Sequence, residues 1–165
     1  MTVKARETRF LVDSTAARLS RWLRLLGYDA VLDRSRSDAV LLARARREGR
    51  VLLTRKRVLG RGSVTDAGGA LLLSSDFVSD QLGQVAREFG LTHHPLPRCT
   101  VCNSELSLAT RAEADGRVPE FVYRSRSEFA YCRRCDKYYW KGTHWENAGR
   151  KASAALSPRP ERRQS

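Results

Sequence analysis

Two Cys-x-x-Cys pairs constrain this chain more than any other feature of its sequence. Cys99 and Cys102 form the first pair, and Cys132 and Cys135 form the second. The chain has four cysteines in all, so each pair can supply two thiolates to one tetrahedral ion without competition. The spacing predicts a structural zinc ion, with free thiols or redox-active pairs as the alternative. Because four thiolates leave no open coordination position, this zinc is expected to hold a fold and not to catalyse a reaction.

Upstream of the cysteines, short apolar runs alternate with amphipathic helical patterns, which is typical of βαβ units and a parallel sheet. Strands are predicted at residues 9–12, 30–32, 51–54 and 70–73. The helical segments each end at a glycine that can close a helix, and they span residues 14–27, 35–49 and 74–90. Ser14 or Thr15 is the expected N-cap of the first helix, and Ser75 is that of the last.

The helical segments have one apolar face each. In the first, the apolar face contains Leu19, Trp22, Leu23 and Leu26, while arginines recur on another face at positions 18, 21 and 24. In the second, the residues expected to be buried are Val40, Leu41 and Ala45.

A change of pattern divides the chain. Residues 91–98 (LTHHPLPR) contain two prolines and no periodicity, and the following segment is rich in aromatic residues. We therefore expect an α/β domain over residues 1–92, a zinc ribbon over residues 98–150 and a disordered tail over residues 151–165.

The charge balance points to a polyanionic partner. The chain has 31 Lys and Arg against 18 Asp and Glu, a formal net charge of +13. It contains no run of 18 apolar residues, which excludes a membrane span, and no N-terminal apolar stretch of signal-peptide length. A cytoplasmic location is therefore expected, and there cysteines stay reduced.

Acidic residues follow or flank the predicted strands. In an open parallel sheet, ligands bind beyond the carboxyl ends of the strands. Asp13 directly ends the first strand, Asp76 follows the fourth, and Asp38 lies in the first turn of the second helix. Such carboxylates can bind Mg²⁺ or Mn²⁺ for phosphodiester hydrolysis. The alternative for Asp38 and Asp76 is that they only favour the positive ends of their helices.

Several of these segments match one family together. They are FLVD at 10–13, ARLSRWLRLLGYD at 17–29, Asp38, GRVLLTR at 49–55, and the paired knuckles with YYWKGTHW at 138–145. In these segments the chain resembles the PIN-like RNases with a C-terminal zinc ribbon, the Mut-seven C-terminal RNase family. The resemblance implies a PIN-like three-layer α/β sandwich with a parallel sheet, a small C-terminal zinc ribbon, a metal-dependent ribonuclease activity, and Asp13 and Asp38 as members of the acidic set.

One position departs from that family. Its members commonly have an acid directly after Leu-Thr-Arg, whereas this chain has Lys56. A protonated lysine cannot bind a divalent ion, and the two would repel by several kcal/mol at about 4 Å. Asp66 in the following loop is an alternative carboxylate, and Lys56 can instead neutralise Asp13 and Asp38 or bind an RNA phosphate.

Two hypotheses remain open. The protein is either a ribonuclease that uses Asp13, Asp38 and Asp76 with Mg²⁺ or Mn²⁺, or a catalytically impaired pseudo-nuclease that binds RNA or an RNA-containing assembly. In both, basic side chains hold RNA phosphates, and aromatic residues near Cys132 either stack bases or only cover the ribbon. The predicted RNA-binding residues are Arg21, Arg24, Arg55, Lys56, Arg57, Arg61, Arg133 and Arg134.

Overall fold

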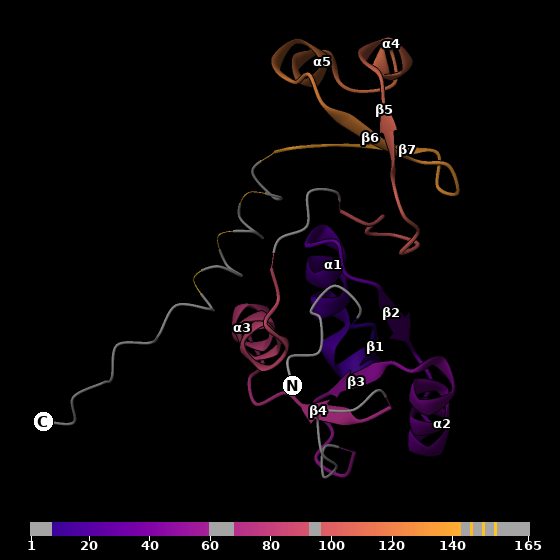
Figure 1. Cartoon of the computed structure of the whole chain (residues 1–165), viewed down its shortest axis with the longest axis vertical. Helices are drawn as coiled ribbons and strands as arrows, with labels where there is room; N and C mark the ends of the chain where they lie inside the picture. Colours follow the sequence, from indigo (N-terminus) through magenta and orange to yellow (C-terminus); the bar gives the residue numbers. More distant parts are fainter. Residues whose placement is uncertain are drawn as a thin grey trace, which may run out of the picture.

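The computed structural model describes residues 8–59, 68–92 and 97–142, together with residues 146, 150 and 154. It is a mixed α/β fold with two separate sheets (Figure 1). The N-terminal part has the element order β1 (Phe10–Asp13), η1 (Ser14–Ala16), α1 (Ala17–Leu25), β2 (Ala30–Asp33), α2 (Asp38–Glu48), β3 (Val51–Thr54), β4 (Ala70–Leu72) and α3 (Val78–Phe89).

The four N-terminal strands form a parallel sheet in the order β2-β1-β3-β4. Phe10 is level with Ala30 of β2 and with Val51 of β3. Every predicted strand is confirmed, with ends that differ by at most one residue. The parallel sheet expected from the alternating pattern is therefore present.

Helices cover both faces of this sheet, as a parallel sheet requires. Successive side chains of a strand point to opposite faces. Phe10 and Val12 accordingly pack in the core beneath α1 and α3, whereas Leu11 packs with Leu41 and Ala45 of α2. The result is the predicted three-layer α/β sandwich.

The predicted N-caps are wrong at two helices. The side chain of Asp13 caps η1, since it accepts a hydrogen bond from the backbone N–H of Thr15. α3 begins only at Val78, after Phe77 as its N-cap. The hydroxyl of Ser75 accepts from the Phe77 N–H at 3.1 Å and so forms a turn before the helix.

The predicted C-caps are confirmed at the second and third helices. Gly49 and Gly90 have φ values of 59° and 61°, the left-handed conformation that closes α2 and α3. α1 ends earlier than predicted, at Leu25, and its C-cap is Leu26.

Two predictions about helix faces need correction. Val40 is 52% exposed, because the buried stripe of α2 runs through Leu41 and Ala45. Arg24 was expected on an exposed basic face but is only 6% exposed. Its guanidinium lies between α1 and the first cysteine pair, where backbone carbonyls replace water around it.

The C-terminal part is a three-stranded antiparallel sheet in the order β5-β6-β7. Two short helices that the sequence analysis did not predict connect β5 to β6 (Figure 1). The sequence signal for the first was present, because Thr110 and Glu113 form a capping box. The elements are β5 (Ser107–Ala109), α4 (Arg111–Ala114), α5 (Glu120–Ser125), β6 (Phe129–Cys132) and β7 (Lys137–Trp140).

Arg24 joins the two parts of the chain. Its Nε donates to the carbonyl oxygen of Ala30 at 2.8 Å, and its Nη1 donates to those of Thr100 and Val101 at 2.9 and 3.2 Å. Burial lowers the pKa of Arg24, but an arginine remains protonated under all ordinary conditions. The turn between Cys99 and Cys102 is therefore fastened to the end of α1 by a charged donor.

Asn103 makes a second link beside Arg24. Its side chain accepts from the N–H of Ala30 at 3.1 Å and donates to Asp29 at 2.7 Å. Burial raises the pKa of Asp29, but hydrogen bonds from Arg50 and Asn103 outweigh burial, so this pKa lies below its usual value. Because Ala30 begins β2 and Asp29 directly precedes it, the first cysteine pair docks at the amino edge of the parallel sheet.

No helix in the described parts of the chain is long and apolar enough to cross a membrane.

Replacing Arg24 by methionine should lower the free energy of unfolding by about 3 kcal/mol, because carbonyl oxygens in a buried contact lose their charged donor. Arg21→Met is the matched control on the same helix, since Arg21 is exposed. Its effect should stay within about 0.5 kcal/mol. Denaturant unfolding of the two variants, followed by circular dichroism, measures the difference, and equal midpoints would show that the Arg24 contacts add no stability.

Candidate functional site

The strand order places a topological switch point between β1 and β3. The chain leaves β1 toward β2 on one side and returns to β3 on the other, and ligands of open parallel sheets bind at such a switch point. Asp13 ends β1 and Thr54 ends β3, and both side chains are fully buried. The predicted acid therefore lies at the switch point itself.

Hydroxyl groups surround the Asp13 carboxylate. Its Oδ2 accepts from the Thr54 hydroxyl at 2.7 Å, and its Oδ1 accepts from the backbone N–H and the hydroxyl of Thr15. The same hydroxyls accept in turn from the next segment. The N–H of Arg55 donates to Thr15 and that of Lys56 donates to Thr54, each at 3.0 Å. One buried carboxylate thus positions the start of the loop after β3.

That loop places the Lys56 ammonium on Asp38. Nζ of Lys56 lies 2.7 Å from Oδ1 of Asp38, and the two side chains are 28% and 39% exposed. The hydrogen bond to Asp38 raises the pKa of Lys56, and the charges of Asp38 and Asp13 raise it further. Lys56 is therefore a cation at neutral pH, and it occupies the position beside the predicted acids.

Asp76 is also paired. Its carboxylate contacts the guanidinium of Arg55, and it is the more exposed partner of that ion pair. The two basic residues that follow β3 thus neutralise two of the three predicted catalytic acids, Asp38 and Asp76.

Asp33 is an acid at the sheet edge that the sequence analysis missed. It directly follows the predicted second strand, as Asp13 follows the first, and the parallel register places the two side by side. Asp33 accepts from Arg44 and from the N–H of Ser35, each at 2.7 Å. Burial raises the pKa of Asp33, but these hydrogen bonds outweigh it and hold that pKa below its usual value. Its carboxylate is therefore already paired with Arg44 of α2.

The acids do not form a metal site of their own in the described ranges. Among residues 8–59, 68–92 and 97–142, the four cysteines are the only group of three or more potential ligands close enough to hold one ion. Asp66, the alternative carboxylate, and Arg61 lie outside the described residues.

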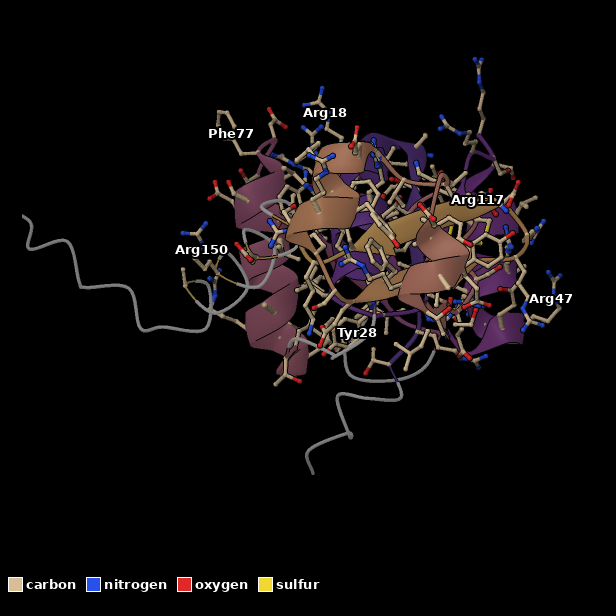
Figure 2. The ribbon with its side chains drawn as sticks, turned by 90° about the horizontal axis from the view of Figure 1, so that it is seen from above. Arg18, Tyr28, Arg47, Phe77, Arg117 and Arg150 are labelled. Carbon is tan, nitrogen blue, oxygen red and sulfur yellow. The ribbon has the colours of Figure 1, made fainter. Side chains whose placement is uncertain are left out.

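Basic residues also follow or begin the elements at this edge of the sheet. We use the name carboxyl rim for the cations at the start of α1 and after β2 and β3, which belong to the edge where the strands end. In Figure 2, Arg18 and Phe77 lie at the upper margin, whereas Tyr28, which follows α1, lies at the lower one. The sequence analysis missed Arg34 and Arg36, although both follow the second strand directly. The carboxyl rim consists of Arg18, Arg34, Arg36, Arg55, Lys56 and Arg57.

The other predicted RNA-binding residues lie elsewhere. Arg21 is exposed on α1, and Arg133 and Arg134 are exposed on the turn between the second pair of cysteines. Arg24 does not fit the prediction, because its guanidinium is buried and already donates to carbonyl oxygens.

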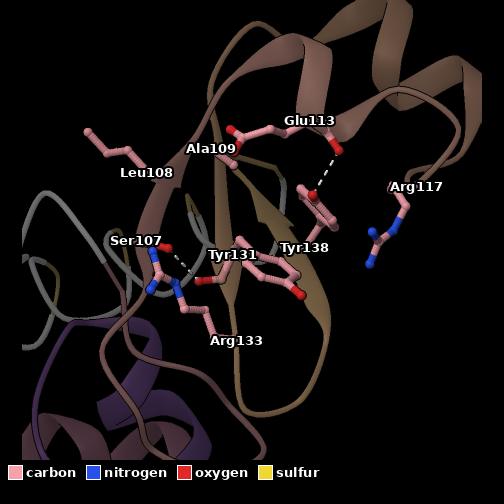
Figure 3. A pocket seen from close by; sticks show the side chains of 8 residues that line it. All are labelled: Ser107, Leu108, Ala109, Glu113, Arg117, Tyr131, Arg133 and Tyr138. Atoms are coloured by element: carbon pink, nitrogen blue, oxygen red, sulfur yellow. Dashed lines mark hydrogen bonds between the residues drawn. The ribbon is translucent and has the colours of Figure 1, made fainter.

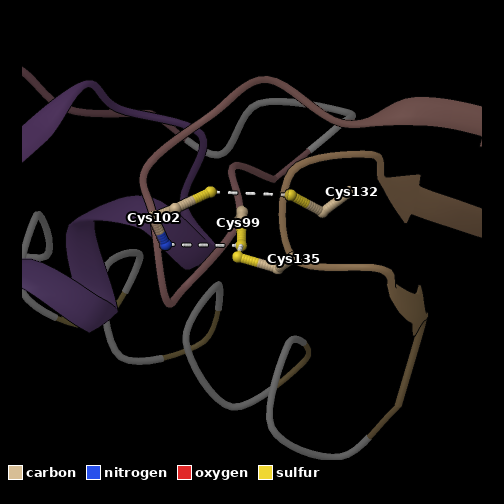
Figure 4. A group of neighbouring side chains, drawn as sticks. All are labelled: Cys99, Cys102, Cys132 and Cys135. Atoms are coloured by element: carbon tan, nitrogen blue, oxygen red, sulfur yellow. Dashed lines mark hydrogen bonds between the residues drawn. The ribbon is translucent and has the colours of Figure 1, made fainter.

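The cysteine pairs meet as predicted. The potential ligand atoms of all four lie within 4.8 Å of one another, and Figure 4 shows the two turns that face each other. The sulfurs of Cys102 and Cys132 are 3.5 Å apart, and those of Cys99 and Cys135 are 3.8 Å apart. Four thiolates around one zinc ion are separated by about 3.8 Å. The cluster therefore fits a metal ion such as zinc.

Local backbone geometry supports the cluster. Asn103 and Asp136, which directly follow the two pairs, have φ values of 67° and 49°, a conformation that Asn and Asp tolerate better than most residues. The N–H of Cys102 points at the sulfur of Cys99, the orientation that stabilises a thiolate. Burial raises the pKa of Cys102, but hydrogen bonds with Ser104 and the neighbouring thiols outweigh it and bring that pKa to about 6.

Comparison with known proteins identifies the family. The model of the Mut7-C RNAse domain matches residues 8–152, which includes both sheets, the switch point and the cysteine cluster. Searches of the curated proteins and of the solved structures found no significant match. Because the family model covers most of the chain, this protein belongs to the Mut7-C RNAse domain family.

Proposed function

We propose that this protein binds RNA at its carboxyl rim and that Lys56 impairs metal-dependent hydrolysis there. Membership of an RNAse domain family supports a nuclease-like function on RNA. The observation that carries the proposal of impairment is the 2.7 Å ion pair between Lys56 and Asp38. Arg18, Arg36 and Arg57 of the rim are exposed and can meet RNA phosphates, since affinity for a polyanion comes mainly from such contacts.

The acids do not fit a catalytic Mg²⁺ or Mn²⁺ ion in this arrangement. Asp13 is fully buried and its two oxygens accept from Thr15 and Thr54, while Asp38 is held by an ammonium group. A divalent ion next to Asp38 would repel that ammonium. We therefore derive no reaction step through a metal ion at the carboxyl rim.

A metal-dependent ribonuclease is the second candidate function. The family match favours it. The ion pair of Lys56 and Asp38 is partly exposed, so the lysine can move into solvent when a competing ion or an RNA phosphate arrives. In that case Asp13, Asp38 and Asp76 would serve as the catalytic acids.

We further propose that the cysteine cluster binds a structural zinc ion through Cys99, Cys102, Cys132 and Cys135. When bound, zinc supplies a cross-link and no chemistry, because four thiolates complete its coordination. The link matters for a ribbon whose own core around the cluster contains few large side chains. A cytoplasmic location suits this assignment, because a reducing compartment would keep the four thiols available to the metal.

The salt dependence of RNA binding tests the carboxyl rim. For single-stranded RNA, log affinity falls linearly with log salt concentration. Removal of two phosphate contacts should make this fall shallower, by about 1.4 in the slope. Arg36→Gln with Arg57→Gln should show this loss, because both guanidinium groups are exposed on the rim. Arg46→Gln with Arg47→Gln, at the other end of α2, is the matched control. Affinity that does not depend on ionic strength would argue for a protein partner instead.

Substitutions of Lys56 test whether its ammonium group impairs cleavage. Lys56→Asp should raise Mn²⁺-dependent cleavage of single-stranded RNA by roughly tenfold or more, the effect of about 1.4 kcal/mol on a barrier. Lys56→Gln removes the ammonium without adding a carboxylate, so it tells whether relief of charge is sufficient. The double variant Asp13→Asn with Lys56→Asp is the blank for contaminating nucleases.

The opposite result would support the second candidate. If the wild-type protein cleaves RNA as fast as Lys56→Asp, and Asp13→Asn abolishes the activity, Lys56 does not disable the site.

The zinc content of the purified protein tests the proposed role of the four cysteines. The purified protein should contain about one zinc ion per chain, bound by two Cys-x-x-Cys pairs. Metal analysis and thiol titration test it. Before chelation the four thiols should react slowly, and after chelation all four should react. A chain that stays fully folded and keeps its thiols protected without any metal would refute the zinc assignment.

A further inference from the structure

The zinc-ribbon part contains a groove that the carboxyl rim does not share. One hollow of ≈ 390 Å³ lies beside β5, β6 and α4 (Figure 3), and a second of ≈ 370 Å³ adjoins it. Ser107, Tyr131 and Arg133 line both hollows. We call the two together the ribbon groove; its lining also includes Leu108, Glu113, Arg117, Arg134 and Tyr138.

Two tyrosines form an aromatic wall of the ribbon groove. Tyr131 of β6 and Tyr138 of β7 are register partners, and their ring centroids are 4.8 Å apart. The Tyr131 hydroxyl donates to Asp136 at 2.5 Å, and the Tyr138 hydroxyl donates to the backbone carbonyl of Glu113 at 2.7 Å. Because both rings are anchored at their hydroxyl ends, the aromatic surface is rigid before any ligand arrives.

The charged residues of the ribbon groove are unequally paired. Arg117 is paired with Asp136. Glu113 accepts from the N–H and the hydroxyl of Thr110 but keeps its negative charge, and the charge of Arg133 acts on it.

Arg133 and Arg134 are exposed, and neither has an ion-pair partner among the described residues. Glu105, which lines the second hollow, is already paired with Arg98. Arg133 and Arg134 therefore face one remaining acid, Glu113, and the excess charge is positive next to the tyrosine wall. This favours an anionic ligand that also carries an aromatic ring.

We propose that the ribbon groove binds one unpaired nucleotide of single-stranded RNA, with the base against Tyr131 and its phosphate at Arg133 and Arg134. A base in a duplex is stacked and cannot reach a tyrosine wall, whereas an unpaired base can. The choice of RNA rests on the proposed function, but the groove shares no residue with the carboxyl rim. It is a second contact for the same strand.

The test uses the zinc-loaded full chain and a fluorescein-labelled single-stranded oligouridylate of about 12 nucleotides, a length that one small domain can cover. Fluorescence anisotropy over a series of salt concentrations gives the affinity. Arg133→Gln with Arg134→Gln should lower the salt slope by about 1.4, the loss of two phosphate contacts. The matched control, Arg124→Gln with Arg126→Gln, removes two arginines from the end of α5 and should leave the slope unchanged.

Variants of the ring give an independent readout. Tyr131→Leu should weaken binding roughly tenfold at constant salt without changing the slope, because it removes stacking and no charge. Tyr131→Phe keeps the ring but loses the hydrogen bond to Asp136, so it should bind several-fold more tightly than Tyr131→Leu. Zinc content equal to that of the wild type shows that each variant retains its ribbon.

The outcomes separate this inference from the proposed function. If the ribbon-groove variants bind like the wild type while Arg36→Gln with Arg57→Gln loses affinity, the groove does not contact RNA and the carboxyl rim alone does. If the wild-type protein does not bind the oligonucleotide at all, both proposals fail. An oligonucleotide that carries 4-thiouridine should photo-cross-link to Tyr131, and cross-links confined to the N-terminal sheet would also overturn the inference.

Discussion

The arrangement of this protein depends on a carboxylate that is buried where its parallel sheet changes direction. Asp13 has no exposed surface, and a buried charge is tolerated only when donors surround it. Thr15 and Thr54 supply those donors, so the ends of β1 and β3 are tied to each other and to the start of the first helix. The hydroxyls also accept from the N–H groups of Arg55 and Lys56. The path of the loop after β3 thus follows from the satisfaction of one acid.

This path decides the electrostatics of the carboxyl rim. It brings Lys56 to Asp38 and Arg55 to Asp76, so that acids expected to bind a metal ion are instead paired with cations. With these acids compensated, the remaining exposed arginines define the charge that a ligand meets. The proposed binding of RNA to that surface needs no metal ion, and the excess of positive charge over the whole chain favours a polyanion in the same way.

The zinc-ribbon part is coupled to the opposite edge of the sheet. Arg24 and Asn103 join the first cysteine turn to the end of α1 and the start of β2. Such hydrogen bonds are strong because the arginine is charged and removed from water. Retention of a metal ion by the cysteines would therefore also support the end of α1. The molecule offers two basic surfaces, the carboxyl rim and the ribbon groove, which are built by different elements.

Whereas the three-layer sandwich was expected from the family resemblance, local patterns in the sequence were sufficient for the strands, the parallel sheet and the meeting of the four cysteines. These features depend on periodicity, glycine stops and ligand spacing, all of which are encoded by neighbouring residues. The departure at Lys56 was also readable, because a single position carries it. The two short helices before β6 were missed, although the capping box of the first, α4, was present.

Only the tertiary structure decided which charged residues are available. Arg24 has the same spacing as Arg18 and Arg21, yet it is buried by a segment far along the chain. Lys56 and Asp38 pair across the sheet edge. Whether a charge meets water or a partner depends on contacts between distant residues, and a helical period carries no information about them.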